Sequence, residues 1–169
     1  MEKIWLKSYL PGIPETIDAG DYTSLKDMIE RHCKMYADRL AYACMGSTMT
    51  YAQLDQRSAA FAAWLQQQGL QKGDRVALMM PNILQYPVAL FGVLRAGFAA
   101  VNVNPLYTTR VLPHHFHDSG ARIIVILAEI GTSVRFSAKK FRHDKKQIMP
   151  QRLELKRIKN SMEFYTCFT

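Results

Sequence analysis

Residues 73–107 read GDRVALMMPNILQYPVALFGVLRAGFAAVNVNPLY, and this stretch decides the fold. It contains two short apolar runs, residues 76–80 and 99–103. Between them, a breaker at Pro81 is followed by an apolar helical pattern at residues 83–96. Parallel strands are covered on both faces, so they do not alternate with polar residues. Two such runs around a helix therefore predict a βαβ unit with parallel strands.

The chain after this unit continues the alternation. A helix capped by Thr108 and an apolar run at residues 122–127 predict a second helix and a third strand. The loop at residues 104–107 falls at the carboxyl end of a parallel strand, where open α/β sheets collect ligands. A simple strand-ending turn explains that loop equally well. In the first helix, Pro87 predicts a regular start near Tyr86 or a kink there.

Two upstream helices carry capping signals. Ser24 precedes an amphipathic pattern and predicts a helix over residues 23–37. Thr50 and Gln53 form a capping box that opens a helix over residues 50–68. The buried stripe expected on this second helix consists of Leu54, Ser58, Phe61, Ala62 and Leu65.

Glycines predict two local features. Short strands at residues 41–45 and 48–50 surround Gly46-Ser47, a dipeptide typical of a hairpin turn. Gly92 lies in the helix between the first two strands, where we expect it to allow close packing of helix on sheet. The sequence thus places a hairpin before the central unit.

The N-terminal segment, residues 1–21, is predicted to be an entry arm. Pro11 and Pro14 favour extended or turn structure there. Trp5 and Tyr9 are expected to pin the arm to the body, and a ligand contact is the alternative.

Composition bounds the class of protein. A chain of 169 residues, 49% of them hydrophobic, is long enough for one globular domain with a core. The net charge of +8 is uneven, with +2 in residues 1–128 and +6 in residues 129–169, so charge does not predict a nucleic-acid partner. Three widely spaced cysteines form no metal or disulfide pattern, and no signal peptide is visible. A cytoplasmic protein is expected.

Three segments together resemble a known family. GDRVALMMPN, QYPVALFGVLRAG and VNVNPLYTTR closely resemble the N-terminal part of bacterial long-chain fatty-acyl-CoA synthetases, which are AMP-forming, adenylate-forming ligases. MTYAQLDQRSAAFAAWLQ is similar to the helix that precedes the first core strand in that family. The likeness runs from about Trp5 to Leu127. It implies an αβα-layered piece of the large ligase domain, with a mostly parallel sheet.

The resemblance also implies a reaction for the complete enzyme. ATP and a fatty acid give an acyl-adenylate and pyrophosphate with magnesium, and coenzyme A then displaces AMP to give the thioester. The family's phosphate-binding loop is rich in Ser, Thr and Gly, because small residues let backbone amides surround a phosphate. This chain has no such run, and the family's later catalytic motifs are also absent. No catalytic, cofactor-binding or metal-binding residue is therefore assigned, and the chain alone is expected to be inactive.

A second departure lies at Val111-Leu112-Pro113, where the family reads Glu-Leu-x-His-Gln in this helix. Val111 cannot complete a capping box with Thr108. Pro113, counted as the fifth helical residue, is expected to cost about 3 kcal/mol. The nearby histidines suggest a metal site only weakly, because adjacent residues face different sides of a helix and no carboxylate or cysteine completes a set. These histidines are His114, His115 and His117.

The third departure is the tail. From about Glu129 the resemblance ends, which suggests a frameshift or an early stop in the coding sequence. A disordered or partly helical basic tail is expected, and the truncated sheet should keep an open edge and an apolar patch that favour self-association. A basic amphipathic helix on an anionic membrane or on nucleic acid is the functional alternative. The residues at helical spacing are Leu155, Ile158, Met162 and Tyr165.

The expected organisation is an entry arm (1–21), an incomplete α/β ligase subdomain (22–127) and a divergent basic tail (128–169). Three functions remain open. The favoured one is the N-terminal fragment of a long-chain fatty-acid–CoA ligase, which uses fatty acid, ATP and CoA when complete. The others are a non-catalytic module whose tail binds membrane or nucleic acid, and a piece of another adenylate-forming ligase. Peripheral contact with the inner face of the cell membrane is left open.

Overall fold

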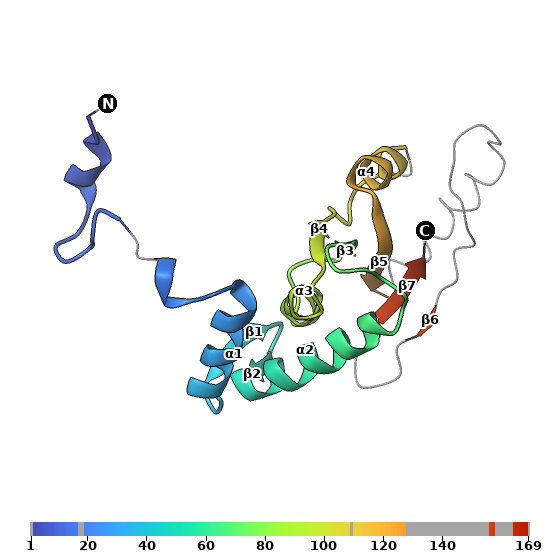
Figure 1. The fold of residues 1–169 in the computed structure, drawn as a ribbon, viewed down its shortest axis with the longest axis horizontal. Coiled ribbons are helices and arrows are strands. Elements are labelled where there is room, and N and C mark those ends of the chain that lie inside the picture. Colours follow the sequence, from blue (N-terminus) through green and yellow to red (C-terminus); the bar gives the residue numbers. More distant parts are fainter. Residues whose placement is uncertain (1, 17–18, 109, 128–155, 158–163, 169) are drawn as a thin grey trace.

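The computed structural model describes residues 2–16, 19–108, 110–127, 156–157 and 164–168 (Figure 1). The helices are η1 (Ile4–Ser8), η2 (Ala19–Asp21), α1 (Leu25–Met35), α2 (Tyr51–Gln66), α3 (Gln85–Arg95) and α4 (Leu112–Ser119). The strands are β1 (Leu40–Cys44), β2 (Ser47–Thr50), β3 (Arg75–Met79), β4 (Ala99–Asn102), β5 (Ala121–Leu127), β6 (Lys156–Arg157) and β7 (Phe164–Phe168).

The main sheet has the strand order β4-β3-β5-β7-β6. β3 pairs in parallel with β4 on one side and with β5 on the other, so the predicted βαβαβ unit is confirmed. β1 and β2 form a separate antiparallel hairpin. The strand that begins the unit in sequence therefore lies between the two strands that follow it.

Helices cover both faces of the parallel strands (Figure 1). Val76, Leu78 and Met80 pack with α2 and α3 on one face, while Ala77 and Met79 pack with α4 on the other. All five side chains are buried, which is why the strand reads as a continuous apolar run. The αβα layering predicted from the sequence is confirmed.

The helix α2 follows its sequence signals closely. Thr50 accepts a hydrogen bond from the backbone N–H of Gln53, and the Gln53 side chain accepts one from the backbone N–H of Thr50. This reciprocal pair is the expected capping box. Gly69 has φ +75°, the left-handed conformation expected just past the helix end. The predicted stripe of five residues is also the set that the helix buries.

Gly92 permits a close approach, although its partner is another helix and not the sheet. A Cβ at this position would lie 2.6 Å from Cδ1 of Phe61 and 3.1 Å from the backbone oxygen of Ser58, both on α2. The expected packing of helix on sheet is therefore wrong at this residue. Glycine is required here because α2 and α3 cross with almost no space between them.

The hairpin turn lies one residue earlier than expected. Met45 and Gly46 have φ values of +49° and +79°, while Ser47 already begins β2. Positive φ at both central residues is the geometry of a type I′ turn, whose twist matches that of the paired strands. The hairpin itself is confirmed.

Helix α4 begins later than the sequence suggested. Thr108 lies before the helix, and Val111 occupies the N-cap position without a capping side chain. Pro113 is consequently the second helical residue and not the fifth. The backbone N–H that proline lacks is unpaired in the first turn of any helix, so the expected cost of about 3 kcal/mol does not arise. Gly120 ends the helix with φ +59°.

The entry arm does not pack on the body as expected. η1 buries none of its residues, and the Trp5 and Tyr9 side chains are 50% and 43% exposed. Its ion pairs, Lys3 with Glu15 and Lys7 with Glu2, both lie within the arm. The arm extends away from the α/β body in Figure 1, so the anchoring role predicted for its aromatic rings is wrong.

The described part of the tail is extended and not helical. β7 pairs antiparallel with β5 along its whole length, and β6 pairs with β7. Tyr165, one of four residues expected on a helix face, lies in β7; the other three lie outside the described residues. The chain thus adds β7 beside β5, and the open edge that the sequence predicts can lie only at the outer strands of the sheet. Within the described residues, the sheet ends at β4 and β6.

Candidate functional site

The strand order β4-β3-β5 reverses direction beside β3, so the topological switch point lies at the carboxyl ends of β3 and β5. The chain leaves β3 toward α3 on one face of the sheet and leaves β4 toward α4 on the opposite face. Such a switch point leaves a crevice at the carboxyl ends of its two strands, where α/β proteins bind ligands. Residues that follow β3 are therefore the first candidates for a site within the described part of the chain, since those that follow β5 lie outside it.

The loop after β4 is a closed turn. Oδ1 of Asn104 accepts a hydrogen bond from the backbone N–H of Leu106 at 2.9 Å, and the backbone oxygen of Asn104 accepts from Tyr107 at 3.1 Å. The ring of Tyr107 meets that of His115 edge-on, with centroids 5.5 Å apart. Both oxygens of Asn104 thus accept hydrogen bonds from within the loop. This favours the strand-ending turn over a ligand loop.

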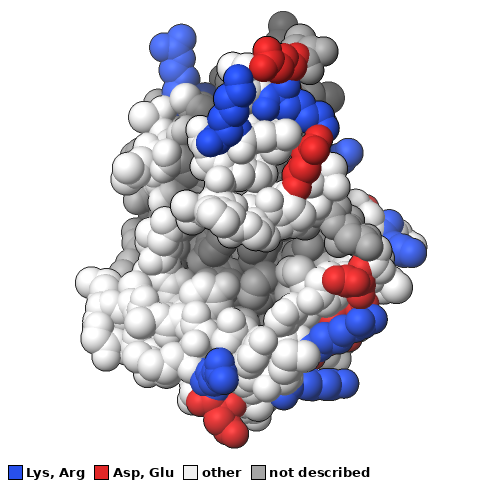
Figure 2. Space-filling model, turned by 90° about the vertical axis from the view of Figure 1, so that its left-hand side faces the viewer, with Lys and Arg blue, Asp and Glu red and all other residues white. Residues whose placement is uncertain are grey.

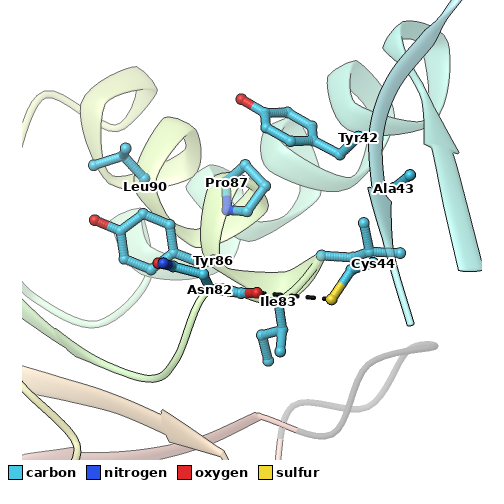
Figure 3. A pocket seen from close by; sticks show the side chains of 9 residues that line it. Tyr42, Ala43, Cys44, Asn82, Ile83, Tyr86, Pro87 and Leu90 are labelled. Atoms are coloured by element: carbon cyan, nitrogen blue, oxygen red, sulfur yellow. Dashed lines mark hydrogen bonds between the residues drawn. The ribbon is translucent and has the colours of Figure 1, made fainter.

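Beside the carboxyl end of β3 lies an apolar cavity of about 330 Å³, which we call the hairpin groove (Figure 3). One wall comes from β1 and the other from the β3–α3 connection and the start of α3. Figure 3 shows Tyr42 and Cys44 of the hairpin across from Ile83 and Pro87. The groove is lined by residues 42–44, residues 82–84, Tyr86, Pro87 and Leu90.

The groove is neutral, and two of its polar groups already have partners. The hydroxyl of Tyr86 donates to Oδ1 of Asn102 at 2.8 Å, which ties α3 to the carboxyl end of β4. The thiol of Cys44 donates to the backbone oxygen of Asn82 at 3.7 Å. Burial raises the pKa of the Tyr42 hydroxyl, so it remains a neutral phenol. The groove is therefore uncharged and mainly apolar, and its other polar side chains are the Tyr42 hydroxyl and the Asn82 amide.

Arg95, the last residue of α3, ties this helix to two others. Its side chain is 10% exposed and reaches from α3 to α1 and α2. It pairs with Glu30 at 3.2 Å and with Asp55 at 2.6 Å, and it donates to Oγ of Ser58 at 2.8 Å. A guanidinium with several donors suits such a three-helix junction. No local pattern in the sequence reveals this junction, because the partners of Arg95 are 37 to 65 residues away in the chain.

The other perturbed ionisable groups are structural. A backbone hydrogen bond from Gln71, and then the guanidinium of Arg122, lower the pKa of Asp74. A backbone hydrogen bond from Thr23 lowers the pKa of Asp27 in the same way. Burial raises the pKa of the Cys33 thiol. These groups stabilise turns, a helix start and the core, and they do not converge on one point.

The described residues offer no metal site. In these ranges no group of three or more His, Cys, Asp or Glu side chains comes together. His117 lies 3.7 Å from its neighbour Asp118, both strongly exposed, and His115 faces the backbone oxygen of Asn102 at 3.4 Å.

Charges on the described surface are mixed in sign. In Figure 2, Lys and Arg side chains lie close to Asp and Glu side chains at the upper end and along one margin, with uncharged surface between them. None of the helices in the described part has the length and apolar character of a membrane span. This face therefore presents no broad field of one sign.

Comparison with known proteins decides the family. The model of the family described as AMP-binding enzyme matches residues 29–164, most of the chain. The chain belongs to the AMP-binding enzyme family. The family match reaches residue 164, so it passes the point near Glu129 where the sequence alone suggested that the resemblance ends.

Within the AMP-binding family, the chain is similar to bacterial long-chain-fatty-acid–CoA ligases. It is 60% identical over 129 residues to the ligase of Yersinia pestis, covering 76% of this chain and 23% of that protein. It is 51% identical over 135 residues to the ligase of Haemophilus influenzae, covering 79% and 24%. The chain spans about a quarter of the length of the curated relatives it matches.

Solved AMP-binding structures share the fold. A fatty acyl CoA synthetase of Mycobacterium tuberculosis superposes with a TM-score of 0.61 at 26% identity, covering 66% of this chain and 22% of that one. A benzoate CoA ligase of Burkholderia xenovorans superposes with a TM-score of 0.63 at 26% identity, covering 68% and 23%. The α/β arrangement described above is thus that of adenylate-forming ligases.

Sequence reasoning assigned no site residue, and it missed the hairpin groove. The groove joins residues 42–44 to residues 82–90, two segments that are adjacent only after the hairpin folds against α3. The helix-breaking pair Pro81-Asn82 is the one local sequence feature at the edge of the groove. No local pattern in the sequence shows that the hairpin returns to that point.

Proposed function

We propose that this chain is the N-terminal part of a long-chain fatty-acid–CoA ligase. In the complete enzyme, fatty acid, ATP and CoA would give acyl-CoA, AMP and pyrophosphate. The observation that carries the proposal is the identity of 51–60% to long-chain-fatty-acid–CoA ligases over about three quarters of this chain. A peptide synthetase of the same family, triostin synthetase I, is only 36% identical, over 107 residues.

The role of this part would be structural. Its described residues build an αβα scaffold, and their carboxylates serve in ion pairs and turns. ATP, magnesium and CoA would be held by other parts of the complete enzyme. The sheet, its covering helices and the carboxyl edge of β3 and β4 would position those parts.

The direct test is adenylate formation by the isolated chain. Exchange of labelled pyrophosphate into ATP, driven by a long-chain fatty acid, should stay at the blank level for the purified 169-residue chain. A full-length long-chain-fatty-acid–CoA ligase serves as the positive control. Fatty-acid-dependent exchange that follows this chain through purification would contradict the proposed role.

A further inference from the structure

The two outer strands of the described sheet differ in charge. At one end, β6 consists of two basic residues, Lys156 and Arg157. At the other end, β4 lies within residues 96–109, a stretch without Lys, Arg, Asp, Glu or His (Figure 1). Charged residues, bulges and prolines keep the edge of a sheet from pairing with another chain. β6 carries such a protection, whereas Ala99–Asn102 of β4 has none of the three.

The outer side of β4 presents backbone hydrogen-bonding groups. The N–H groups of Ala99 and Val103 donate to β3, at 2.9 and 3.0 Å. Neighbouring residues of a strand direct these groups to opposite sides, so those of Ala100 and Asn102 point away from β3. The oxygen of Asn102 lies 3.4 Å from Nε2 of His115, but a carbonyl oxygen has a second lone pair. Groups in such a row fit the extended backbone of another strand.

This row of groups is self-complementary. Two copies of β4 can run antiparallel about a two-fold axis through Val101, which places Ala100 of each copy opposite Asn102 of the other. Each of these pairs then exchanges both of its hydrogen bonds. No like charges meet across the axis, because the strand is uncharged. Two β6 edges would instead bring basic residues together, so the geometry favours β4 as the pairing edge.

We propose that two copies of this chain form a dimer by antiparallel pairing of β4 with β4 about Val101. The same strand serves on both sides, as in the isologous interfaces of most closed dimers. The main sheet then continues from one copy into the other. Because β4 is short, the dimer exchanges with monomer. The proposed function does not use this outer edge, so the two proposals can fail independently.

Disulfide trapping tests the register of this pairing. The two Val101 residues would form a non-hydrogen-bonded pair on the axis, with Cα atoms about 4.5 Å apart. A disulfide joins Cα atoms about 4.4–6.8 Å apart, so V101C should form an interchain disulfide under mild oxidation. The matched control is A99C on the same strand. Its two copies would lie about 13 Å apart along the strands, which is too far for a disulfide.

The intact 169-residue chain and both variants are oxidised and compared on non-reducing gels. We expect V101C to give at least roughly five times as much cross-linked dimer as A99C, and the unsubstituted chain gives the background from its own cysteines. Sedimentation equilibrium of the reduced chains measures the association itself. A100P removes an outward N–H and should weaken it at least tenfold, roughly. Thermal unfolding of each reduced variant checks that the chain remains folded.

Four results would overturn the proposal. An unsubstituted chain that stays monomeric up to its solubility limit would reject it, as would equal cross-linking of V101C and A99C. A dimer that V101C fails to trap, or that a folded A100P retains, would place the contact elsewhere on the molecule. Oligomers larger than a dimer would show that the contact does not close about a two-fold axis. None of these results bears on the identity of the chain as a ligase part.

Discussion

The two faces of the parallel sheet are covered in different ways. On one face, α2 and α3 pack on Val76 and Leu78, and α1 and the hairpin form a further layer beyond them. On the other face, the described chain provides the eight-residue α4 alone. The α3 face has a capping box, a helix contact that requires glycine and a buried arginine junction. The α4 face has an uncapped helix start with proline in its first turn.

This difference shows where the fold is specified. The α3 face depends on contacts that admit few alternatives, whereas α4 is held by a small apolar set that includes Leu112 and Phe116. Substitutions should therefore cost more on the α3 face than equivalent ones on the α4 face. The free energy of unfolding of substituted chains, measured by urea denaturation, tests this contrast.

The largest effect is expected at Gly92. G92A should lower the free energy of unfolding by about 3 kcal/mol, because its Cβ would overlap the buried Phe61 ring and crowd the Ser58 backbone oxygen. G120A on the α4 side should cost about 1 kcal/mol, mainly from its left-handed backbone, since its Cβ would meet only the flexible Arg75 side chain, at 3.1 Å from Nη1. Equal costs for the two substitutions would remove the proposed contrast between the faces.

The next effect is expected at Arg95. R95A should lower the free energy of unfolding by about 2 kcal/mol, since it leaves the half-buried Glu30 and Asp55 without their partner. The matched control R31A removes an exposed ion pair to Asp27 and should cost about 0.5 kcal/mol. If R95A lowered the free energy of unfolding no more than R31A, the three-helix junction would contribute little to stability.

A smaller effect is expected at the start of α2. T50A removes the hydroxyl that accepts from Gln53 and should cost about 1 kcal/mol. T50S keeps that hydroxyl and should retain most of the stability. A loss in T50S as large as that in T50A would show that the methyl group, and not the cap, matters.

The smallest effect is expected at Pro113. P113A should change the free energy of unfolding by less than about 0.5 kcal/mol, because the proline lies in the first turn of α4. A stabilisation near the roughly 3 kcal/mol of a mid-helix proline would mean that the helix begins earlier than Leu112.

Local signals in the sequence were sufficient for the strands and helix ends. The apolar runs of β3 and β5 and the capping box at Thr50 follow from burial on both faces and from backbone hydrogen bonding, which neighbouring residues reveal. The start of α4 was predicted about one turn too early. The cost expected at Pro113 and the missing cap expected at Val111 were derived from that early start. The strand β7 was missed because the family resemblance ends near Glu129, so a disordered or partly helical tail was expected there.

Contacts between segments distant in the sequence could not be predicted from such local signals. Gly92 and Arg95 were placed correctly on α3, yet their partners on α2 and α1 depend on how the helices cross. The hairpin groove depends in the same way on the return of β1 to the end of β3. These features became visible only in the folded chain.

The most direct test of the account is a chimera. The segment of the Yersinia pestis ligase that this chain matches is replaced by the corresponding 129 residues of this chain, and acyl-CoA formation from a long-chain fatty acid, ATP and CoA is measured. If this chain supplies the scaffold and other segments supply the chemistry, the chimera should retain activity while the 169-residue chain alone has none. A folded chimera without activity, or an active chain alone, would contradict the account.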